Sequence, residues 1–122
     1  MTAAPDAGLV TRKPGDPPNV CWLSCDGALR SQLALAGPRP VVVDFSAAWC
    51  TKCKGVEPLV VALARAHPGL RFVVADADGC PDFAAACRFA PTFVVFKNGR
   101  RVDEWVGVNE HLLTDRVWLH AD

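Results

Sequence analysis

The segment VVVDFSAAWCTKCK, residues 41–54, carries the strongest structural and chemical signal in the chain. Its first six residues are mostly β-branched or apolar, which is typical of a central strand covered on both faces. Cys50 and Cys53 follow, and a segment with apolar residues at helical spacing begins there. Two cysteines separated by two residues can bind a metal, form a structural disulfide, or cycle between dithiol and disulfide.

The position of the pair between a strand and a helix favours redox chemistry. Unpaired backbone N–H groups and the helix dipole stabilise an anion at the start of a helix. The pKa of the Cys50 thiol is therefore expected to fall, which makes it a nucleophile at neutral pH. Cys53 lies one turn further on and can attack a mixed disulfide to release the product. Asp44 interrupts the apolar strand, and a buried carboxyl held neutral can exchange a proton with a nearby thiol.

The other four cysteines leave two interpretations open. A structural zinc site requires four ligands, but neither Cys21 with Cys25 nor Cys80 with Cys87 repeats the CxxC spacing. We therefore favour a redox dithiol over a zinc site and assign no metal ligand. Buried thiols that behave as small hydrophobes are the simplest interpretation of these four residues.

Apolar periodicity and turn residues predict the remaining elements. Asn98-Gly99 favours a tight hairpin because both residues tolerate positive φ, and Asp26 and Asn109 are the expected N-caps of two helices. We expect strands at 20–23, 41–46, 70–78, 92–97 and 101–107, and helices at 25–37, from the cysteine pair to 66, at 81–87 and at 109–120. Strands that alternate with helices imply βαβ crossovers. The order predicts an α/β domain with a mixed central sheet, parallel strands plus a C-terminal antiparallel hairpin, flanked by helices on both faces.

Length and charge narrow the class of protein. The 122 residues suit one domain, 51% of them are hydrophobic, and 13 basic residues balance 13 acidic ones. A neutral chain has no electrostatic footprint for nucleic acid or an anionic membrane, so we expect neither as a partner. Residues 1–19, rich in Pro, Gly and charge, predict a flexible leader before a domain at 20–122. The leader has no apolar signal region and no apolar run could span a membrane, so we expect a cytoplasmic protein.

Two separated motifs give the chain a family resemblance. VVVDFSAAWCTKCK resembles the active-site segment of thioredoxins, the animal ones especially. APTFVVFKNGRRVDEWVGVNEHL, residues 90–112, resembles their segment from the cis-proline through the final hairpin to the last helix. The similarity is in one register apart from a gap before Pro91. It implies a thioredoxin fold and a dithiol–disulfide exchange activity that needs no cofactor beyond the Cys50–Cys53 pair.

The resemblance also assigns roles to individual residues. Cys50 corresponds to the attacking cysteine and Cys53 to the resolving one, and Asp44 corresponds to the buried carboxylate that manages the proton of the resolving thiol. Cys80 and Cys87 have the spacing of a cysteine pair with regulatory redox behaviour in animal thioredoxins. The residues that correspond to the substrate groove are Trp49, Ala90, Pro91, Thr92, Val106, Gly107 and Val108, with Pro91 as the cis-proline.

Thr51 and Lys52 depart from the family, which usually has Gly-Pro between the two cysteines. Replacing the proline adds a backbone donor close to the Cys50 sulfur, and Lys52 adds positive charge near it. Both changes favour the thiolate, so we expect a less reducing potential. The third strand also lacks the lysine that bacterial members carry near the buried aspartate. The pKa of Asp44 is therefore expected to be raised, since its desolvation is not compensated.

We therefore predict a protein-disulfide reductase, and two alternatives stay open. One is a more oxidising thioredoxin-like oxidase or isomerase, suggested by Thr51 and Lys52. The other is a non-catalytic adaptor that uses the same fold to bind partners. The expected partners are disulfide-containing protein substrates, with a thioredoxin reductase as the electron donor, and the expected oligomeric state is a monomer.

Overall fold

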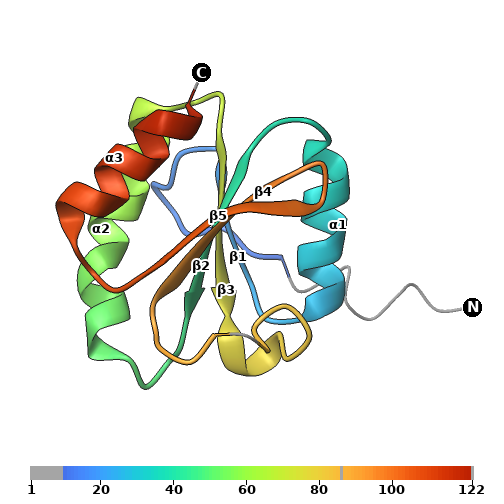
Figure 1. Ribbon diagram of the computed structural model, residues 1–122, viewed down its shortest axis with the longest axis vertical. Coiled ribbons are helices and arrows are strands. Elements are labelled where there is room, and N and C mark those ends of the chain that lie inside the picture. The colour runs from blue at the N-terminus through green and yellow to red at the C-terminus, as the bar shows by residue number, and fades with distance from the viewer. Residues whose placement is uncertain (1–9, 86, 122) are drawn as a thin grey trace, which may run out of the picture.

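The computed structural model describes residues 10–85 and 87–121, which form a five-stranded sheet covered by helices (Figure 1). The elements are β1 (Val20–Leu23), α1 (Asp26–Ala36), β2 (Val41–Ser46), α2 (Thr51–Ala66), β3 (Arg71–Asp76), the short 3-10 helix η2 (Ala77–Gly79), β4 (Thr92–Lys97), β5 (Arg100–Val106) and α3 (Glu110–His120).

The sheet has the order β1-β3-β2-β4-β5, with β2 at its centre. β1 and β2 run parallel to β3, whereas β4 runs antiparallel to β2. β5 pairs antiparallel with β4 through the predicted hairpin, where Asn98 (φ 54°) and Gly99 (φ 76°) both have positive φ. All six residues of β2 are buried, as its apolar pattern predicts for a central strand. The predicted mixed sheet with a C-terminal antiparallel hairpin is confirmed.

Alternate residues of β2 face two separate cores. Val43 and Phe45 pack in a core that includes residues of α1, and Val42 packs in a core that includes residues of α2 and α3. Figure 1 shows α1 on one side of the sheet and α2 with α3 on the other. Because side chains alternate along a strand, Asp44 points to the same side as Val42, toward α2.

Two predictions near α1 are wrong. Cys25, not Asp26, is the N-cap of α1, and its Sγ accepts a hydrogen bond of 3.4 Å from the N–H of Ala28. The predicted helix at 81–87 is absent from the described residues 81–85, which form turns. The carboxylate of Asp26 accepts hydrogen bonds of 3.0 Å from the N–H groups of Asp82 and Phe83. These bonds satisfy the backbone without a helix, and a segment this short gains little from helical hydrogen bonds.

The described part of the predicted leader, residues 10–19, is packed against the domain. Thr11 forms an antiparallel bridge with Trp22 of β1. The side-chain nitrogen of Asn19 lies 2.9–3.2 Å from three carbonyl oxygens at the end of α2 and just beyond it, those of Ala64, His67 and Leu70. The described residues 10–19 therefore contact the domain that is predicted to begin at residue 20. Residues 1–9 lie outside the described part of the chain.

The last helix, α3, packs on the sheet through a narrow apolar face. Asn109 is its N-cap, as predicted, and accepts a hydrogen bond of 3.0 Å from the N–H of Leu112. Leu113 and Val117 are buried, whereas Trp118 is exposed. Within the described ranges, no helix is both long and apolar enough to cross a bilayer.

Candidate active site

The N-terminus of α2 holds both cysteines of the CxxC pair. Cys50 is the N-cap and Cys53 lies in the first turn. The two form a disulfide, with their Cα atoms 5.3 Å apart. The N–H of Cys53 donates a hydrogen bond of 3.1 Å to the Sγ of Cys50, and the same donor stabilises negative charge on that sulfur after reduction. Cys50 is 6% exposed and Cys53 is fully buried, so a substrate meets Cys50 first.

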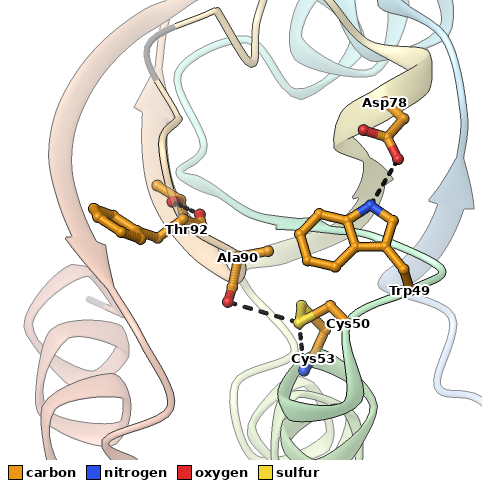
Figure 2. Close-up of a disulfide and its surroundings, with 7 residues drawn as sticks. Trp49, Cys50, Cys53, Asp78, Ala90 and Thr92 are labelled. Carbon is orange, nitrogen blue, oxygen red and sulfur yellow. Dashed lines mark hydrogen bonds between the residues drawn. A yellow bond between two sulfur atoms is a disulfide. The ribbon is translucent and has the colours of Figure 1, made fainter.

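Trp49 lies beside the disulfide and is held by Asp78 of η2 (Figure 2). Its indole N–H donates a hydrogen bond of 3.0 Å to the Oδ2 of Asp78. The side chain is 72% exposed, so its ring presents an apolar surface to solvent while its one polar atom is anchored. The sequence reasoning identified Trp49 but missed Asp78. The sequence contained a usable signal for Asp78. Asp78 follows β3 and Trp49 follows β2, and parallel neighbouring strands end at the same edge of a sheet.

The segment before β4 completes the other side of the pair. The Ala90–Pro91 peptide bond is cis, as the resemblance implies. The carbonyl oxygen of Ala90 lies 3.6 Å from the Sγ of Cys50, a contact that Figure 2 also shows. The N–H of Gly107 donates a hydrogen bond of 2.9 Å to the carbonyl oxygen of Pro91. The loop after β5 is therefore tied to the cis-proline segment beside the disulfide.

Thr92 and its neighbours differ in what they offer to a partner. The Thr92 side chain is buried, and its hydroxyl donates a hydrogen bond of 2.6 Å to the carbonyl oxygen of Phe89, so it shapes the turn. Phe89 is 67% exposed, and the sequence reasoning missed it. We call the exposed apolar side chains of the segments around the disulfide the apolar rim: Trp49, Phe89, Val106 and Val108.

Asp44 is a buried carboxyl on the α2 side of the sheet. It is 1% exposed, and neither of its oxygens has a hydrogen-bond partner among the described residues. In the sheet register its neighbours are Val74 on β3 and Phe93 on β4, both apolar. Burial, with a smaller contribution from the charge of Glu57, raises the pKa of Asp44 to about 8. The predicted rise is confirmed, and Val74 stands opposite Asp44 on the strand that lacks the bacterial lysine.

Glu57 is a second acid near this carboxyl that the sequence reasoning missed. It lies four residues after Cys53, a spacing that places both side chains on one face of α2. Its side chain lines a hollow of about 230 Å³, together with Val74 and the polar residues Ser46, Lys54 and Asp76. The hollow lies between α2, the end of β2 and β3, so it provides space for water on the side of the sheet that carries Asp44.

The remaining predicted residues are placed as follows. Thr51 and Lys52 are the first two residues of α2, and both are exposed. Cys80 is fully buried and Cys87 is half-buried. Burial, with the charges of Asp26, Cys25 and Asp76, raises the pKa of the Cys80 thiol to about 12, and burial also raises the pKa of Cys87. Over residues 10–85 and 87–121, no cluster of three or more His, Cys, Asp or Glu side chains could hold a metal ion.

Known sequences share this arrangement. The Thioredoxin family model matches residues 28–117. The chain is 42% identical over 88 residues to the thioredoxin of Equus caballus, which covers 70% of this chain and 84% of the horse protein. It is 39% identical over 82 residues to Thioredoxin-like 3-3 of Arabidopsis thaliana, which covers 67% of this chain. The match spans 65% of the length of that plant relative.

Solved structures agree with the sequence matches. A crystal structure of a thioredoxin from Nicotiana alata superposes with a TM-score of 0.81 at 26% identity, covering 91% of this chain and 100% of that one. The thioredoxin of Fasciola hepatica gives a TM-score of 0.76 at 35% identity, covering 81% of this chain and 97% of that one.

The fold and the site together define a class of protein. A mixed sheet with a CxxC disulfide at a helix N-terminus, beside a cis-proline, is the architecture of a thiol–disulfide oxidoreductase domain, and the described residues form one. With the matched family model and relatives, the chain belongs to the thioredoxin family.

Proposed function

We propose that the protein reduces disulfides in protein substrates, with the Cys50–Cys53 dithiol as the source of electrons. The observation that carries the proposal is the disulfide-forming pair at the start of α2, bordered by the apolar rim. An exposed apolar surface around a reactive sulfur suits an extended peptide segment, which can lay alternate side chains on it.

The reaction follows from which sulfur a substrate can reach. In the reduced protein, the Cys50 thiolate attacks one sulfur of the substrate disulfide, and the other substrate sulfur leaves as a thiolate. Cys53 then loses its proton and attacks the Cys50 sulfur of the mixed disulfide. The Cys50–Cys53 bond forms, the second substrate thiolate leaves, and two electrons have passed to the substrate. Cys53 is buried and therefore serves only as the resolving residue.

Asp44 is proposed to take the proton from Cys53 during the second attack. A pKa of about 8 lies close to that of an ordinary thiol, so transfer between the two groups costs little free energy. Glu57, which lines the hollow and contributes to the raised pKa of Asp44, is proposed to pass the proton on to solvent. Asp44 itself lies between the apolar residues Val74 and Phe93. Because they exclude bulk water, the pKa of Asp44 stays raised and close to that of the thiol.

The groove residues are proposed to position the substrate. Ala90, Pro91 and Gly107 present backbone beside Cys50, and the rim side chains Trp49 and Val106 supply apolar contact. Phe89 adds an apolar contact that the sequence reasoning did not foresee. These groups hold the substrate disulfide in line with the Cys50 sulfur, since a displacement at sulfur requires the three sulfur atoms to align.

A trapping experiment tests the proposed reaction. The Cys53→Ser variant can attack but cannot resolve. It should therefore accumulate a mixed disulfide with a disulfide-bonded substrate such as insulin. Cys50→Ser should trap nothing, and the wild type should release free insulin chains. The mixed species is detected by non-reducing electrophoresis and mass spectrometry. Equal trapping by Cys50→Ser would contradict the attacking role of Cys50, and insulin reduction by that variant at the wild-type rate would favour the adaptor alternative.

The residues between the cysteines support a second, more oxidising function. Lys52 is exposed in the first turn of α2, and that turn contains no acidic residue. Positive charge near the start of the helix favours the Cys50 thiolate, and stabilising the thiolate stabilises the reduced protein. We therefore propose a less reducing potential than that of a Gly-Pro protein, which suits an isomerase or oxidase.

Equilibration with glutathione tests the direction. The wild type and Lys52→Pro are incubated over a series of glutathione ratios, and the oxidised fraction is measured after acid quenching. The wild type should have the higher potential, by roughly 30 mV for a tenfold change in the equilibrium constant. An equal or lower potential for the wild type would contradict the proposal.

The setting of the reaction is also proposed. Family membership supports a thioredoxin reductase as the electron donor and disulfide-containing proteins as substrates. We propose a cytoplasmic monomer that needs no further cofactor, because the dithiol carries the electrons. Reduction of the Cys50–Cys53 disulfide by NADPH and a thioredoxin reductase, followed by absorbance at 340 nm, tests the donor.

A further inference from the structure

A second pair of cysteines lies on the opposite side of the sheet from α2. Cys25 lies before α1 and Cys80 lies directly after η2, and both pack in the core cluster on the α1 side. The residues next to them are in contact. A Cβ atom on Gly79 would lie 2.1 Å from the carbonyl oxygen of Ser24, so the two backbones approach as closely as glycine permits.

The contacts continue on the other side of the two cysteines. The carboxylate of Asp26 accepts hydrogen bonds of 3.0 Å from the N–H groups of Asp82 and Phe83. Contacts therefore lie on both sides of the two cysteines, between Ser24 and Gly79 and between Asp26 and residues 82–83. They hold the backbone of Cys25 close to that of Cys80. The pKa of the Cys80 thiol is raised mainly by burial, and the charge of Cys25 is among the smaller causes, which agrees with this placement.

Exposure divides the pair into an accessible and an inaccessible sulfur. Cys25 is half-buried, and its Sγ accepts the N–H of Ala28 at the start of α1. Cys80 is fully buried. The arrangement repeats that of Cys50 and Cys53, in which a cysteine that caps a helix can be reached and its neighbour can only resolve.

We propose that Cys25 and Cys80 are a second redox-active pair, which closes to a Cys25–Cys80 disulfide when the chain meets a low-molecular-weight disulfide such as oxidised glutathione. The pair would join the start of α1 to the segment that carries Asp78, the residue that holds Trp49. Because Asp78 lies two positions before Cys80, closure of this disulfide would act on the Trp49 side chain of the apolar rim.

The exchange balances in two steps. The Cys25 thiolate attacks oxidised glutathione, which forms a Cys25–glutathione mixed disulfide and releases one glutathione thiolate. The Cys80 thiol then loses its proton to solvent or to that thiolate and attacks the Cys25 sulfur. The second glutathione leaves, and the two electrons lost by the protein thiols reside on two molecules of reduced glutathione.

The surroundings of the Cys80 thiol affect how fast this disulfide closes. Burial, with smaller contributions from the charges of Asp26 and Asp76, raises the pKa of the Cys80 thiol. The second step should therefore be slow at neutral pH, and reduced glutathione should reverse the bond. The pair would respond to sustained oxidation rather than turn over with each substrate.

The test uses protein in which Cys50→Ser and Cys53→Ser remove the first pair. After incubation with oxidised glutathione, intact mass should show the loss of one pair of hydrogen atoms and no retained glutathione. Cleavage before Asp82 separates Cys80 from Cys87, and cleavage after Trp22 separates Cys21 from Cys25. Mapping should therefore show Cys25 joined to Cys80, and dithiothreitol should reverse the change.

Single substitutions in the same background provide the controls. Cys25→Ser keeps an oxygen that can cap α1, so the variant should fold and should fail to close. Cys21→Ala and Cys87→Ala should still close. Closure should raise the Tm of the parent protein and leave the Tm of Cys25→Ser unchanged. Stable glutathionylation of Cys25, a bond between Cys80 and Cys87, or four unreacted thiols would overturn the proposal.

Discussion

Helices α1 and α2 begin with the same device and differ in what surrounds it. In both, the N-cap is a cysteine whose sulfur accepts the N–H of the residue three positions on, at 3.4 Å for Cys25 and 3.1 Å for Cys50. The first turn of α2 has no acidic residue and contains Lys52. The first turn of α1 begins with Asp26, whose charge also acts on Cys80.

The surroundings therefore decide the chemistry that the cap supports. Around Cys50, a basic first turn and the apolar rim favour a thiolate that meets peptide substrates. Beside Cys25, burial and the charges of Asp26, Cys25 and Asp76 raise the pKa of the Cys80 thiol to about 12. A helix N-terminus alone does not make a catalytic cysteine, because local charge can reinforce or oppose the helix dipole.

The largest expected difference between the two caps is in catalysis. Cys50→Ser should reduce insulin-disulfide reduction to the uncatalysed rate, because the attacking sulfur is lost. Cys25→Ser should leave the initial rate unchanged, since this residue packs in the core on the α1 side of the sheet. Both rates are measured with dithiothreitol as the electron donor. A large loss in Cys25→Ser would show that the two caps are not separate.

The second largest effect concerns the buried carboxyl beneath α2. Folding raises the pKa of Asp44 from 3.8 to about 8, so its neutral form is favoured in the folded protein. Its contribution to stability is fully present below about pH 4 and is lost as the pH rises through about 8. Asp44→Asn should therefore increase the free energy of unfolding at pH 7 by roughly 4 kcal/mol. Urea unfolding from pH 4 to 9 measures it, with reduced protein.

Asp103 provides a matched control of opposite sign. Although partial burial opposes the change, hydrogen bonds from His120 and the backbone and the charge of Arg116 lower its pKa. Its contribution to stability is present above its unfolded pKa and is lost as the pH falls through the lower folded value. Asp103→Asn should thus destabilise the protein at pH 7, by about 1 kcal/mol for a partly exposed group. Asp44→Asn that destabilises in the same way would contradict the assigned pKa.

The third prediction changes the charge beside the second pair. Asp26→Asn removes a carboxylate that raises the pKa of Cys80 but keeps an oxygen that can accept an N–H of the 82–83 segment. Closure of the Cys25–Cys80 disulfide should become several-fold faster at pH 7. Quenched-flow alkylation and mass spectrometry follow the closure, with Asp115→Asn as a control on α3. A slower closure in Asp26→Asn would mean that the carboxylate acts by position rather than charge.

The smallest effect is expected at the rim. Asp78→Asn weakens the hydrogen bond from the indole N–H of Trp49 and should raise KM for insulin about threefold, with kcat little changed, as for a loss of about 0.7 kcal/mol. Trp49→Phe should give a similar KM, because it removes the same donor. A double variant that adds no further loss would confirm that the two residues act through one bond. Additive losses would refute it.

The residues with local signals were the ones that the sequence located correctly. The buried strand 41–46, the cysteine pair, the Asn98-Gly99 hairpin and the Asn109 cap all depend on neighbours in the chain, and the structure confirms each. The identity of Pro91 as a cis-proline came from the family resemblance, since no local pattern distinguishes it from an ordinary strand-edge proline.

The misses depend on contacts between distant parts of the chain. Asp26 has the composition of an N-cap, but its carboxylate is used by the backbone of residues 82 and 83, which also removes the need for a helix there. Asp78 acts at the site through its hydrogen bond with the indole of Trp49, which lies 29 residues away in the chain. Glu57 could have been identified from the sequence, because it lies four residues after Cys53 and so shares a face of the helix with it.

The amide of Asn19 has a practical consequence for how the protein can be shortened. This one side chain reaches the backbone oxygens of Ala64, His67 and Leu70, where the long helix ends and the chain turns into β3. A chain shortened to start at Val20 would keep every catalytic group but lose these hydrogen bonds of Asn19. Fusion or truncation at that point should therefore loosen the far end of the helix that carries the cysteines, although the join lies outside every recognisable motif.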